Sequence, residues 1–318
     1  MSVTVVGSIA YDAVKTPFGE RERMLGGAAT HFALAASFFD EVRVVGPVGG
    51  DFGEEDFAVL RTRGTITDDV QVVADGKTFF WAGEYGWDLN SRDTLDTQLN
   101  VFEHFQPKLS EPARDCDVLF LANIQPTLQL DVLDQCHEPR WTALDSMNLW
   151  IDIARDALLE VIGRVDCVIL NDAELRQLTG QPNLVSAARR LLSSGAASPS
   201  VVVAKQGEYG VALITADGFF ALPAYPLESV IDPTGAGDTF AGGFVGYVAQ
   251  HLQDGPLTLD QDVLRRATAY GTALASFNVE EFGTERVARL TAEEIHERVA
   301  AIHGFGRFDL RPADLAAA

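Results

Sequence analysis

The sequence predicts an α/β fold of three layers, in which helices cover both faces of a mostly parallel central sheet. Two observations lead to this prediction. Short, continuous runs of apolar and often β-branched residues recur along the chain, and helical segments separate them. Strands that are apolar on both faces are typical of parallel sheets buried between helices. The chain has 318 residues, 47% of them hydrophobic, which suffices for one large domain with a sizeable core.

The expected strands share a short apolar run and lie at residues 3–6, 42–45, 118–121, 165–170 and 201–204. Residues 28–39 are apolar nearly all round, which predicts a buried helix. A second helix is expected at 184–193. Near the C-terminus, Thr291 and Glu294 stand at the spacing of a capping box and predict the start of another helix.

Two early stretches, residues 10–24 and 70–90, interrupt this alternation. Both are β-prone or rich in turn residues, and we interpret them as a small β lid that projects from the edge of the sheet within a single domain spanning 1–318. Phe79, Phe80 and Trp81 are too apolar for a fully exposed hairpin, so they should face a ligand, a partner subunit or the body. Surface hairpins without a role in a site remain the alternative.

Charge and composition exclude several classes of protein. The 24 basic and 46 acidic residues give a net charge of −22, which disfavours nucleic acids and membrane surfaces as partners. No apolar run approaches the ~18 residues of a membrane span, and the N-terminus resembles a strand more than a signal peptide. Three cysteines without a CxxC pair indicate reduced thiols and a cytoplasmic location. Because only four of the basic residues are lysines, the composition indicates either a salty cytoplasm or a GC-rich genome.

The most informative segment is 232–244, which reads DPTGAGDTFAGGF. Its Gly-Ala-Gly run lies at the start of a predicted helix, where unpaired amides and the helix dipole favour an anion. Asp238 would repel a bound phosphate, but it can take a proton from a hydroxyl that attacks that phosphate. We therefore predict Asp238 as the base, with the amides of Gly235, Ala236 and Gly237 stabilising the developing charge. An ordinary N-cap aspartate is the alternative reading.

Other nucleotide-binding motifs are absent. There is no Walker A sequence, and no G-x-G-x-x-G lies between a strand and a helix. A nicotinamide dehydrogenase is therefore a remote hypothesis.

Residues 232–240 resemble the second signature of the ribokinase, or pfkB, family of carbohydrate kinases. Further matches follow in family order, within residues 3–300, at 7–12, 26–27, 46–53, 171–174 and 205–210. The resemblance implies a ribokinase-like fold. It also implies transfer of the γ-phosphoryl group of ATP to a primary hydroxyl of a sugar or nucleoside. A non-catalytic sugar or nucleotide sensor with the same fold is the alternative, although a sensor would not need Asp238.

For the acceptor, the resemblance implies contacts from Asp12, Gly26, Gly27, His31 and Asn123. His31 stands where the family commonly has asparagine. A neutral histidine also offers one donor and one acceptor, with a different reach. The aromatic lid residues favour a ring-containing acceptor over an open-chain sugar acid.

For the nucleotide, the resemblance implies that Asn171 and Glu174 position Mg²⁺ through water, although their spacing also fits a capping box. It places the adenine between the 205–210 loop and a later helix. The contacts would come from Lys205, Gly207, Gly210, Thr268 and Gly271. Carbonyls near Asp232 and Thr234 would hold a monovalent cation such as K⁺. We also expect a homodimer through the lid.

Overall fold

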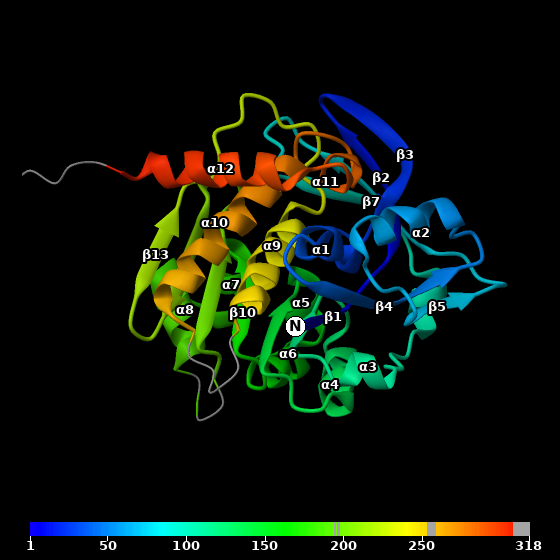
Figure 1. Ribbon diagram of the computed structural model, residues 1–318, viewed down its shortest axis with the longest axis horizontal. Helices are drawn as coiled ribbons and strands as arrows, with labels where there is room; N and C mark the ends of the chain where they lie inside the picture. Colours follow the sequence, from blue (N-terminus) through cyan, green and yellow to red (C-terminus); the bar gives the residue numbers. More distant parts are fainter. Residues whose placement is uncertain (194, 196–197, 253–258, 308–318) are drawn as a thin grey trace, which may run out of the picture.

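The computed structural model describes residues 1–193, 195, 198–252 and 259–307. In this part of the chain a nine-stranded sheet forms the centre of the molecule (Figure 1). In spatial order its strands are β13 (Phe219–Leu222), β12 (Val211–Thr215), β11 (Val201–Lys205), β10 (Cys167–Asn171), β9 (Trp141–Asp145), β8 (Val118–Leu121), β1 (Ser2–Val6), β4 (Glu41–Gly49) and β5 (Val70–Val73). All neighbouring pairs from β11 to β5 are parallel, whereas β12 and β13 are antiparallel additions at one edge. The predicted mostly parallel sheet is confirmed.

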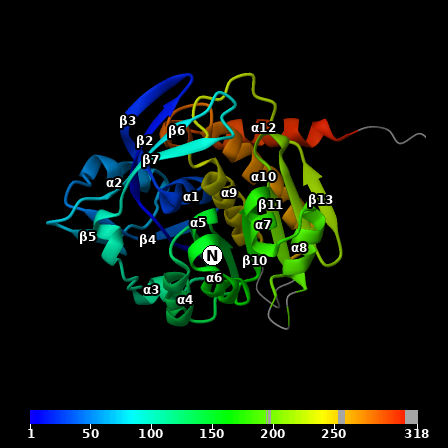
Figure 2. The same ribbon diagram turned by 180° about the vertical axis from the view of Figure 1, so that it is seen from behind.

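Helices cover both faces of this sheet, as Figures 1 and 2 show from opposite sides. One face carries α1 (Ala28–Ala36), α9 (Ala236–His251) and α10 (Gln261–Asn278). The other carries α3 (Glu111–Arg114), α4 (Pro126–Gln135), α5 (Asn148–Ile153), α6 (Arg155–Ile162), α7 (Asp172–Thr179) and α8 (Leu184–Leu192). Val5 belongs to the first core layer and Val6 to the second, which explains why the strands are apolar without alternation.

The remaining helices are not assigned to these two layers, although Leu60 at the end of α2 belongs to the first core layer. They are α2 (Glu54–Leu60), α11 (Glu285–Ala288), α12 (Ala292–Phe305), and the short 3₁₀ helices η1 (Arg61–Arg63), η2 (Asn100–His104) and η3 (Gly207–Tyr209). The capping box predicted at Thr291 and Glu294 does begin α12. None of the helices in the described ranges has the length and hydropathy needed to cross a bilayer.

A second, four-stranded sheet lies in the upper part of both views (Figures 1 and 2). Its order is β3 (Gly19–Gly26), β2 (Ala10–Thr16), β6 (Phe79–Tyr85) and β7 (Arg92–Gln98), and we call it the small sheet. The expectation for residues 70–90 needs correction, because Val70–Val73 pairs with β4 in the central sheet. The small sheet instead extends to Gln98. Every residue of β7 is exposed, so this strand lacks the apolar alternation that would have identified it in the sequence.

The base of the small sheet is tied to the central sheet by one carboxylate. Asp51 follows β4, and its Oδ1 accepts hydrogen bonds from the amide (2.7 Å) and the hydroxyl (2.8 Å) of Thr78, just before β6. β2 follows β1 after only three residues. The small sheet therefore starts directly beside the carboxyl end of β1.

Candidate active site

Polar residues gather at the carboxyl edge of the central sheet. They end or follow adjacent parallel strands: Lys205 on β11, Asn171 on β10, Asp145 on β9, Asn123 after β8 and Ser8 after β1. In open α/β sheets this edge is where ligands bind. The predicted residues Lys205, Asn171 and Asn123 are therefore neighbours in space as well.

The start of α9 forms the predicted anion-binding loop. Gly235 is its N-cap and has φ 74°, a left-handed conformation that favours glycine. A Cβ there would lie 2.4 Å from the His31 ring, which leaves no room for a side chain. No backbone acceptor is recorded in the described chain for the amides of Gly235 and Gly237, whereas the Ala236 amide donates to the Pro233 carbonyl (3.3 Å). Two of the three predicted amides are thus available to an anion.

Lys205 adds a positive charge to this loop. A Cβ built on Gly237 would lie 3.0 Å from the Lys205 ammonium, and the ammonium forms an ion pair with Asp145 (2.7 Å). Burial alone would lower the pKa of Lys205, but Asp145 and Glu174 outweigh burial and hold it above its usual value. The lysine is therefore charged where the loop amides converge, which fits the predicted phosphate contact.

Asp238 occupies the first turn of α9. Burial raises its pKa to about 7, and Asp145 adds to the shift, while Lys205 and Arg92 oppose it. A base is most effective when its pKa lies near the working pH. Asp238 therefore has the position and the proton affinity expected of a general base.

Asp12 faces Asp238 from the small sheet and is 6% exposed. Burial raises its pKa to about 7, and the charges of Asp232 and Asp238 add to this. The predicted glycines shape its surroundings: a Cβ on Gly26 would lie 2.0 Å from Asp12 Oδ2, and the Gly27 amide donates a hydrogen bond to the carboxyl. Asp12, Gly26 and Gly27 thus lie together; their contact with an acceptor stays a prediction.

His31 was predicted to contact the acceptor, but it lies buried beneath the anion-binding loop. It is 2% exposed, and burial lowers its pKa to about 4, so its ring is neutral. Asn278 donates through Nδ2 to the Thr234 carbonyl (2.7 Å), so its Oδ1 is free to accept from His31 Nδ1 (3.0 Å) and from the Thr239 hydroxyl (3.0 Å). His31 Nε2 is buried without a partner. The ring therefore supports the anion-binding loop from below, and a contact with an acceptor hydroxyl would require movement.

Asn171 and Glu174 form the capping box of α7. The Glu174 amide donates to Asn171 Oδ1 and the Asn171 amide donates to Glu174 Oε2, both at 2.8 Å. Burial raises the pKa of Glu174 to about 7, whereas Lys205 lowers it. No group of three His, Cys, Asp or Glu in the described ranges could hold a metal ion alone. Glu174 Oε1 remains as an oxygen donor, which fits a Mg²⁺ bound mainly through nucleotide phosphates and water.

Asp232 is fully buried and lies just before the anion-binding loop. Its Oδ1 accepts the Thr234 amide (2.9 Å) and its Oδ2 the Gly283 amide (3.0 Å). Burial raises its pKa, and these two hydrogen bonds counteract the shift. No cationic side chain in the described residues pairs with this carboxyl.

The predicted nucleotide contacts divide into two groups. Gly207 and Gly210 flank an exposed loop after β11, and the tip of the small sheet reaches it: Asn90 Nδ2 donates to Glu208 Oε1 (3.2 Å). Thr268 is 0% exposed and its hydroxyl donates to the Leu264 carbonyl, so it has no surface for a ligand. Gly271 lies where α10 approaches Phe240 of α9. We therefore correct the prediction for Thr268 and Gly271, which serve helix packing.

Asn123 lies at the expected edge, but its Oδ1 accepts the indole N–H of Trp150 (2.9 Å) on α5. Its amide nitrogen is the group left for a ligand.

Four residues of the site were not predicted from the sequence as members of it: Tyr85, Arg92, Asp145 and Asn278. Asp145 was detectable, because it is a carboxylate at the end of a continuous apolar strand. Tyr85 and Arg92 come from the small sheet, where the Thr234 hydroxyl donates to the Tyr85 hydroxyl (3.1 Å). No local sequence signal connects residues 85 and 92 with position 234.

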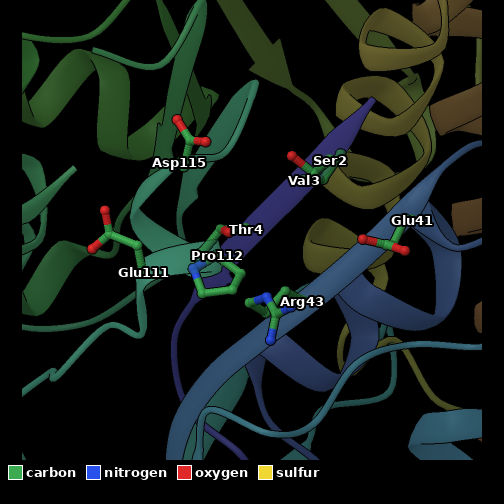
Figure 3. A pocket seen from close by; sticks show the side chains of 8 residues that line it. All are labelled: Ser2, Val3, Thr4, Glu41, Arg43, Glu111, Pro112 and Asp115. Atoms are coloured by element: carbon green, nitrogen blue, oxygen red, sulfur yellow. The ribbon is translucent and has the colours of Figure 1, made fainter. Parts of the chain in front are cut away.

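A separate cavity of about 390 Å³ lies at the opposite edge of the sheet, at the amino ends of β1 and β4. Figure 3 shows Arg43, Glu41, Glu111 and Asp115 among its lining residues. It does not contain any of the residues described above.

Comparisons with known proteins agree with this geometry. A model of pfkB family carbohydrate kinases matches residues 2–289. A cytidine kinase of Thermococcus kodakarensis is 33% identical over 254 residues, covering 78% of this chain and 88% of the relative. A nucleoside kinase of Methanothermobacter thermautotrophicus is 25% identical over 296 residues, 84% of this chain and 85% of that protein.

Solved structures share the fold. A nucleoside kinase of Burkholderia thailandensis in complex with ADP-inosine gives a TM-score of 0.77 at 20% identity and covers 99% of both chains. An aminoimidazole riboside kinase of Salmonella enterica, complexed with aminoimidazole riboside and an ATP analog, gives 0.70 at 20% identity and covers 94% of this chain and 100% of that one. The predicted fold and family are confirmed: the chain belongs to the pfkB family of carbohydrate kinases and is a phosphotransferase that acts on an alcohol group.

Proposed function

We propose that this protein is a nucleoside kinase that transfers the γ-phosphoryl group of ATP to the primary hydroxyl of a nucleoside. One observation supports the chemistry above all others. Asp238, a partly buried aspartate whose pKa is raised to about 7, lies in the first turn after a loop of free amides, and its charge acts on a second, buried aspartate, Asp12. A donor site for phosphate and an acceptor site for hydroxyls thus meet at one proton acceptor.

Each group of residues in the site has its own role in this reaction. Asp12 accepts hydrogen bonds from the acceptor's hydroxyls and orients it. Asp238 takes the proton of the attacking hydroxyl. The amides of Gly235 and Gly237, with Lys205, hold the charge that develops on the transferred group. Mg²⁺, when bound to the nucleotide, neutralises phosphate oxygens, and Glu174 with Asn171 would position it through water.

A nucleoside is favoured as the acceptor by the small sheet and by the relatives. Trp81 is the register partner of Asp12 in the parallel β2–β6 pair, so both side chains lie on one face. Phe79 instead stacks on Phe102 (5.6 Å between ring centroids), and Phe80 packs on the central core. Of the three aromatic residues considered in the sequence, Trp81 is the one available to a base. The cytidine kinase and nucleoside kinase relatives point to the same class of acceptor.

The small sheet acts in this proposal as a lid. Its tip contacts the nucleotide loop through Asn90 and Glu208, and Tyr85 contacts the anion-binding loop at Thr234. Closure of such a sheet excludes water from the reacting groups. Its exposed edge strand β7, with Leu95 on the strand and Leu99 just after it on the surface, is the proposed dimer contact. Light scattering on the wild type and on Leu95→Glu tests this contact.

A monovalent cation beside Asp232 is also part of the proposal. The buried carboxyl lacks a cationic partner in the described chain, and backbone carbonyls near Thr234 offer the oxygen ligands such an ion prefers. Activity should be higher in KCl than in choline chloride at equal ionic strength.

A panel of acceptors tests the proposed function. Purified protein is incubated with ATP and Mg²⁺ and with nucleosides, ribose, fructose or 2-keto-3-deoxygluconate, and ADP release is followed. We expect the highest kcat/KM with a nucleoside. A higher value with a sugar or sugar acid would exclude the nucleoside assignment, and tight binding without turnover would favour a sensor.

A further inference from the structure

Gln129 is a polar residue at a position of the core. It belongs to α4, whose buried residues are Pro126, Gln129 and Val132, spaced as on the side of a helix that faces the core. Gln129 is 0% exposed, and its Oε1 has no hydrogen-bond partner in the described part of the chain. Burying an amide costs free energy unless its groups are hydrogen-bonded. Any contribution of this amide to the structure therefore comes from its nitrogen, Nε2.

The Gln129 amide nitrogen joins two neighbouring strands at the point where their pairing ends. The parallel β8–β9 ladder stops at Leu121 and Leu144. The next pair in this register would be Ala122 and Asp145, and Gln129 Nε2 donates to the carbonyls of both, at 3.0 and 3.2 Å. The Leu121 carbonyl is a third acceptor at 3.4 Å. The reverse orientation of the amide would point its oxygen at three carbonyl oxygens, so these contacts fix Nε2 as the donor.

The two strand ends that Gln129 joins carry residues of the active site. Asn123 follows β8 and is the predicted acceptor contact. At the end of β9, Asp145 Oδ2 forms the ion pair with the Lys205 ammonium (2.7 Å), and Asp145 Oδ1 accepts the Ser146 amide (2.8 Å). Gln129 holds the backbone carbonyl of the same aspartate. It therefore helps to set where the Asp145 carboxylate lies.

The connection continues from Asp145 to the anion-binding loop. The Lys205 ammonium lies 3.0 Å from the place that a Cβ on Gly237 would take, so it borders the loop amides. A lysine ammonium is a point charge on a flexible stem, and its position depends on the partner that holds it. A misplacement of about 1 Å in a group that positions a substrate can cost about 10²-fold in rate.

We infer that Gln129 is a positioning residue of the phosphoryl transfer. It holds Asp145 by the backbone carbonyl, and Asp145 in turn holds the Lys205 ammonium beside the anion-binding loop. The inference rests on the phosphate contact proposed for Lys205. Gln129 itself touches none of the reacting groups, because it is fully buried on the core side of α4.

A double-mutant cycle between Gln129 and Lys205 tests the inference. Gln129→Met keeps the length of the side chain and removes the donor. Lys205→Gln removes the charge beside the loop and keeps a donor for Asp145. For the wild type, both single variants and the double variant, kcat is measured together with KM for ATP and for an acceptor that the wild type turns over. All assays are run well below the lowest melting temperature, so that loss of folded protein does not contribute.

The matched control is Gln135→Met. Gln135 lies at the other end of α4 and also joins two backbone groups: its Nε2 donates to the Pro107 carbonyl (2.9 Å) and its Oε1 accepts the Leu109 amide (3.2 Å). It contacts no residue of the active site. Gln129→Leu, which also lacks a donor, repeats the cycle and serves as the second variant if Gln129→Met does not fold.

We expect kcat of Gln129→Met to fall about 10- to 100-fold, with KM for the acceptor nearly unchanged. In the Lys205→Gln background the same substitution should cost less than about twofold, because its effect passes through Lys205. Gln135→Met should keep the wild-type kcat.

Three results would overturn the inference: a wild-type kcat in Gln129→Met, an equal loss in Gln135→Met, or losses that multiply in the double variant to within about twofold, as for independent sites. A purely structural role of Gln129 predicts the last of these. If Lys205→Gln alone leaves kcat unchanged, the phosphate contact proposed for Lys205 is wrong, and the inference is wrong with it.

Discussion

Burial controls the charge of individual residues in this site. It raises the pKa values of Asp12, Glu174 and Asp238, each to about 7, although Lys205 and Arg92 lie nearby. These carboxyls have pKa values near 4 in an unfolded chain. Folding therefore favours their protonated forms, and ionising them at neutral pH costs stability.

The pH dependence of stability follows from the sign of these shifts. Because the folded pKa lies above the unfolded one, the stabilisation is complete below about pH 4 and is lost as the pH rises through about 7. We expect the free energy of unfolding of the ligand-free wild type to fall between pH 5 and 8 relative to Asp238→Asn, which cannot ionise there. Urea unfolding of both proteins at each pH measures this difference. Parallel curves would contradict the raised pKa of Asp238.

Asn278 is expected to be the most sensitive polar residue beneath the anion-binding loop. Asn278→Ala removes the partner of the Thr234 carbonyl, the Thr239 hydroxyl and His31 Nδ1. Each buried group left unpaired costs about 1–3 kcal/mol. Chemical denaturation should show a loss in this range or above it, while Gln250→Ala, at the exposed end of α9, should cost less than about 1 kcal/mol. Equal effects would mean that the network is not needed.

Sequence reasoning found the residues that sit in local motifs. Asp238, Gly235 and Gly237 were proposed because a glycine run at a helix start favours an anion. Asp12 and Gly26 came from the family resemblance. Arg92 and Asn278 escaped because each reaches the site across a long sequence separation. We interpreted His31 as a ligand contact. The packing of α1 against α9 instead places its ring directly beneath Gly235, and this packing is not visible in the sequence.

At the level of elements, α7 combines a structural and a functional task. Asn171 and Glu174 close its capping box, so a loss of activity on mutation could reflect loss of the helix start. Glu174→Gln separates the two tasks, because glutamine also serves in a capping box. We expect an unchanged melting temperature and a higher Mg²⁺ concentration for half-maximal activity. If the Mg²⁺ dependence is also unchanged, Glu174 is a capping residue alone.

The two sheets differed in how well they could be predicted. The strands β1, β4, β8, β10 and β11 were found because burial between two helical layers imposes continuous apolar runs. The strands β9, β12 and β13 were not expected, and β5 was assigned to the lid. The small sheet was found in part, since β2 and β6 contain aromatic and β-branched residues. β7 was missed because its sequence, RDTLDTQ, is polar and fully exposed. Its strand conformation comes from pairing with β6.

For the whole molecule, net charge makes stability depend on the salt concentration. An excess of 22 negative charges repels itself in the folded state. Screening relieves this repulsion, because the Debye length falls from ~10 Å at 0.1 M to ~3 Å at 1 M salt. The melting temperature should rise between 0.1 and 1 M KCl, and NaCl should act alike. A flat or falling melting temperature would contradict adaptation to a salty cytoplasm.

The most direct test of the account is the turnover of Asp238→Asn. Asparagine keeps the shape of the helix start but cannot accept the proton. General-base catalysis is worth ~10²–10⁴-fold, so kcat should fall by that amount while nucleotide affinity is kept or increased. Asp238→Ala serves as the comparison: if Asp238 were only a cap, this variant would lose about 1 kcal/mol of stability and keep its turnover. A kcat of Asp238→Asn above about a tenth of the wild-type value would show that Asp238 is not the base.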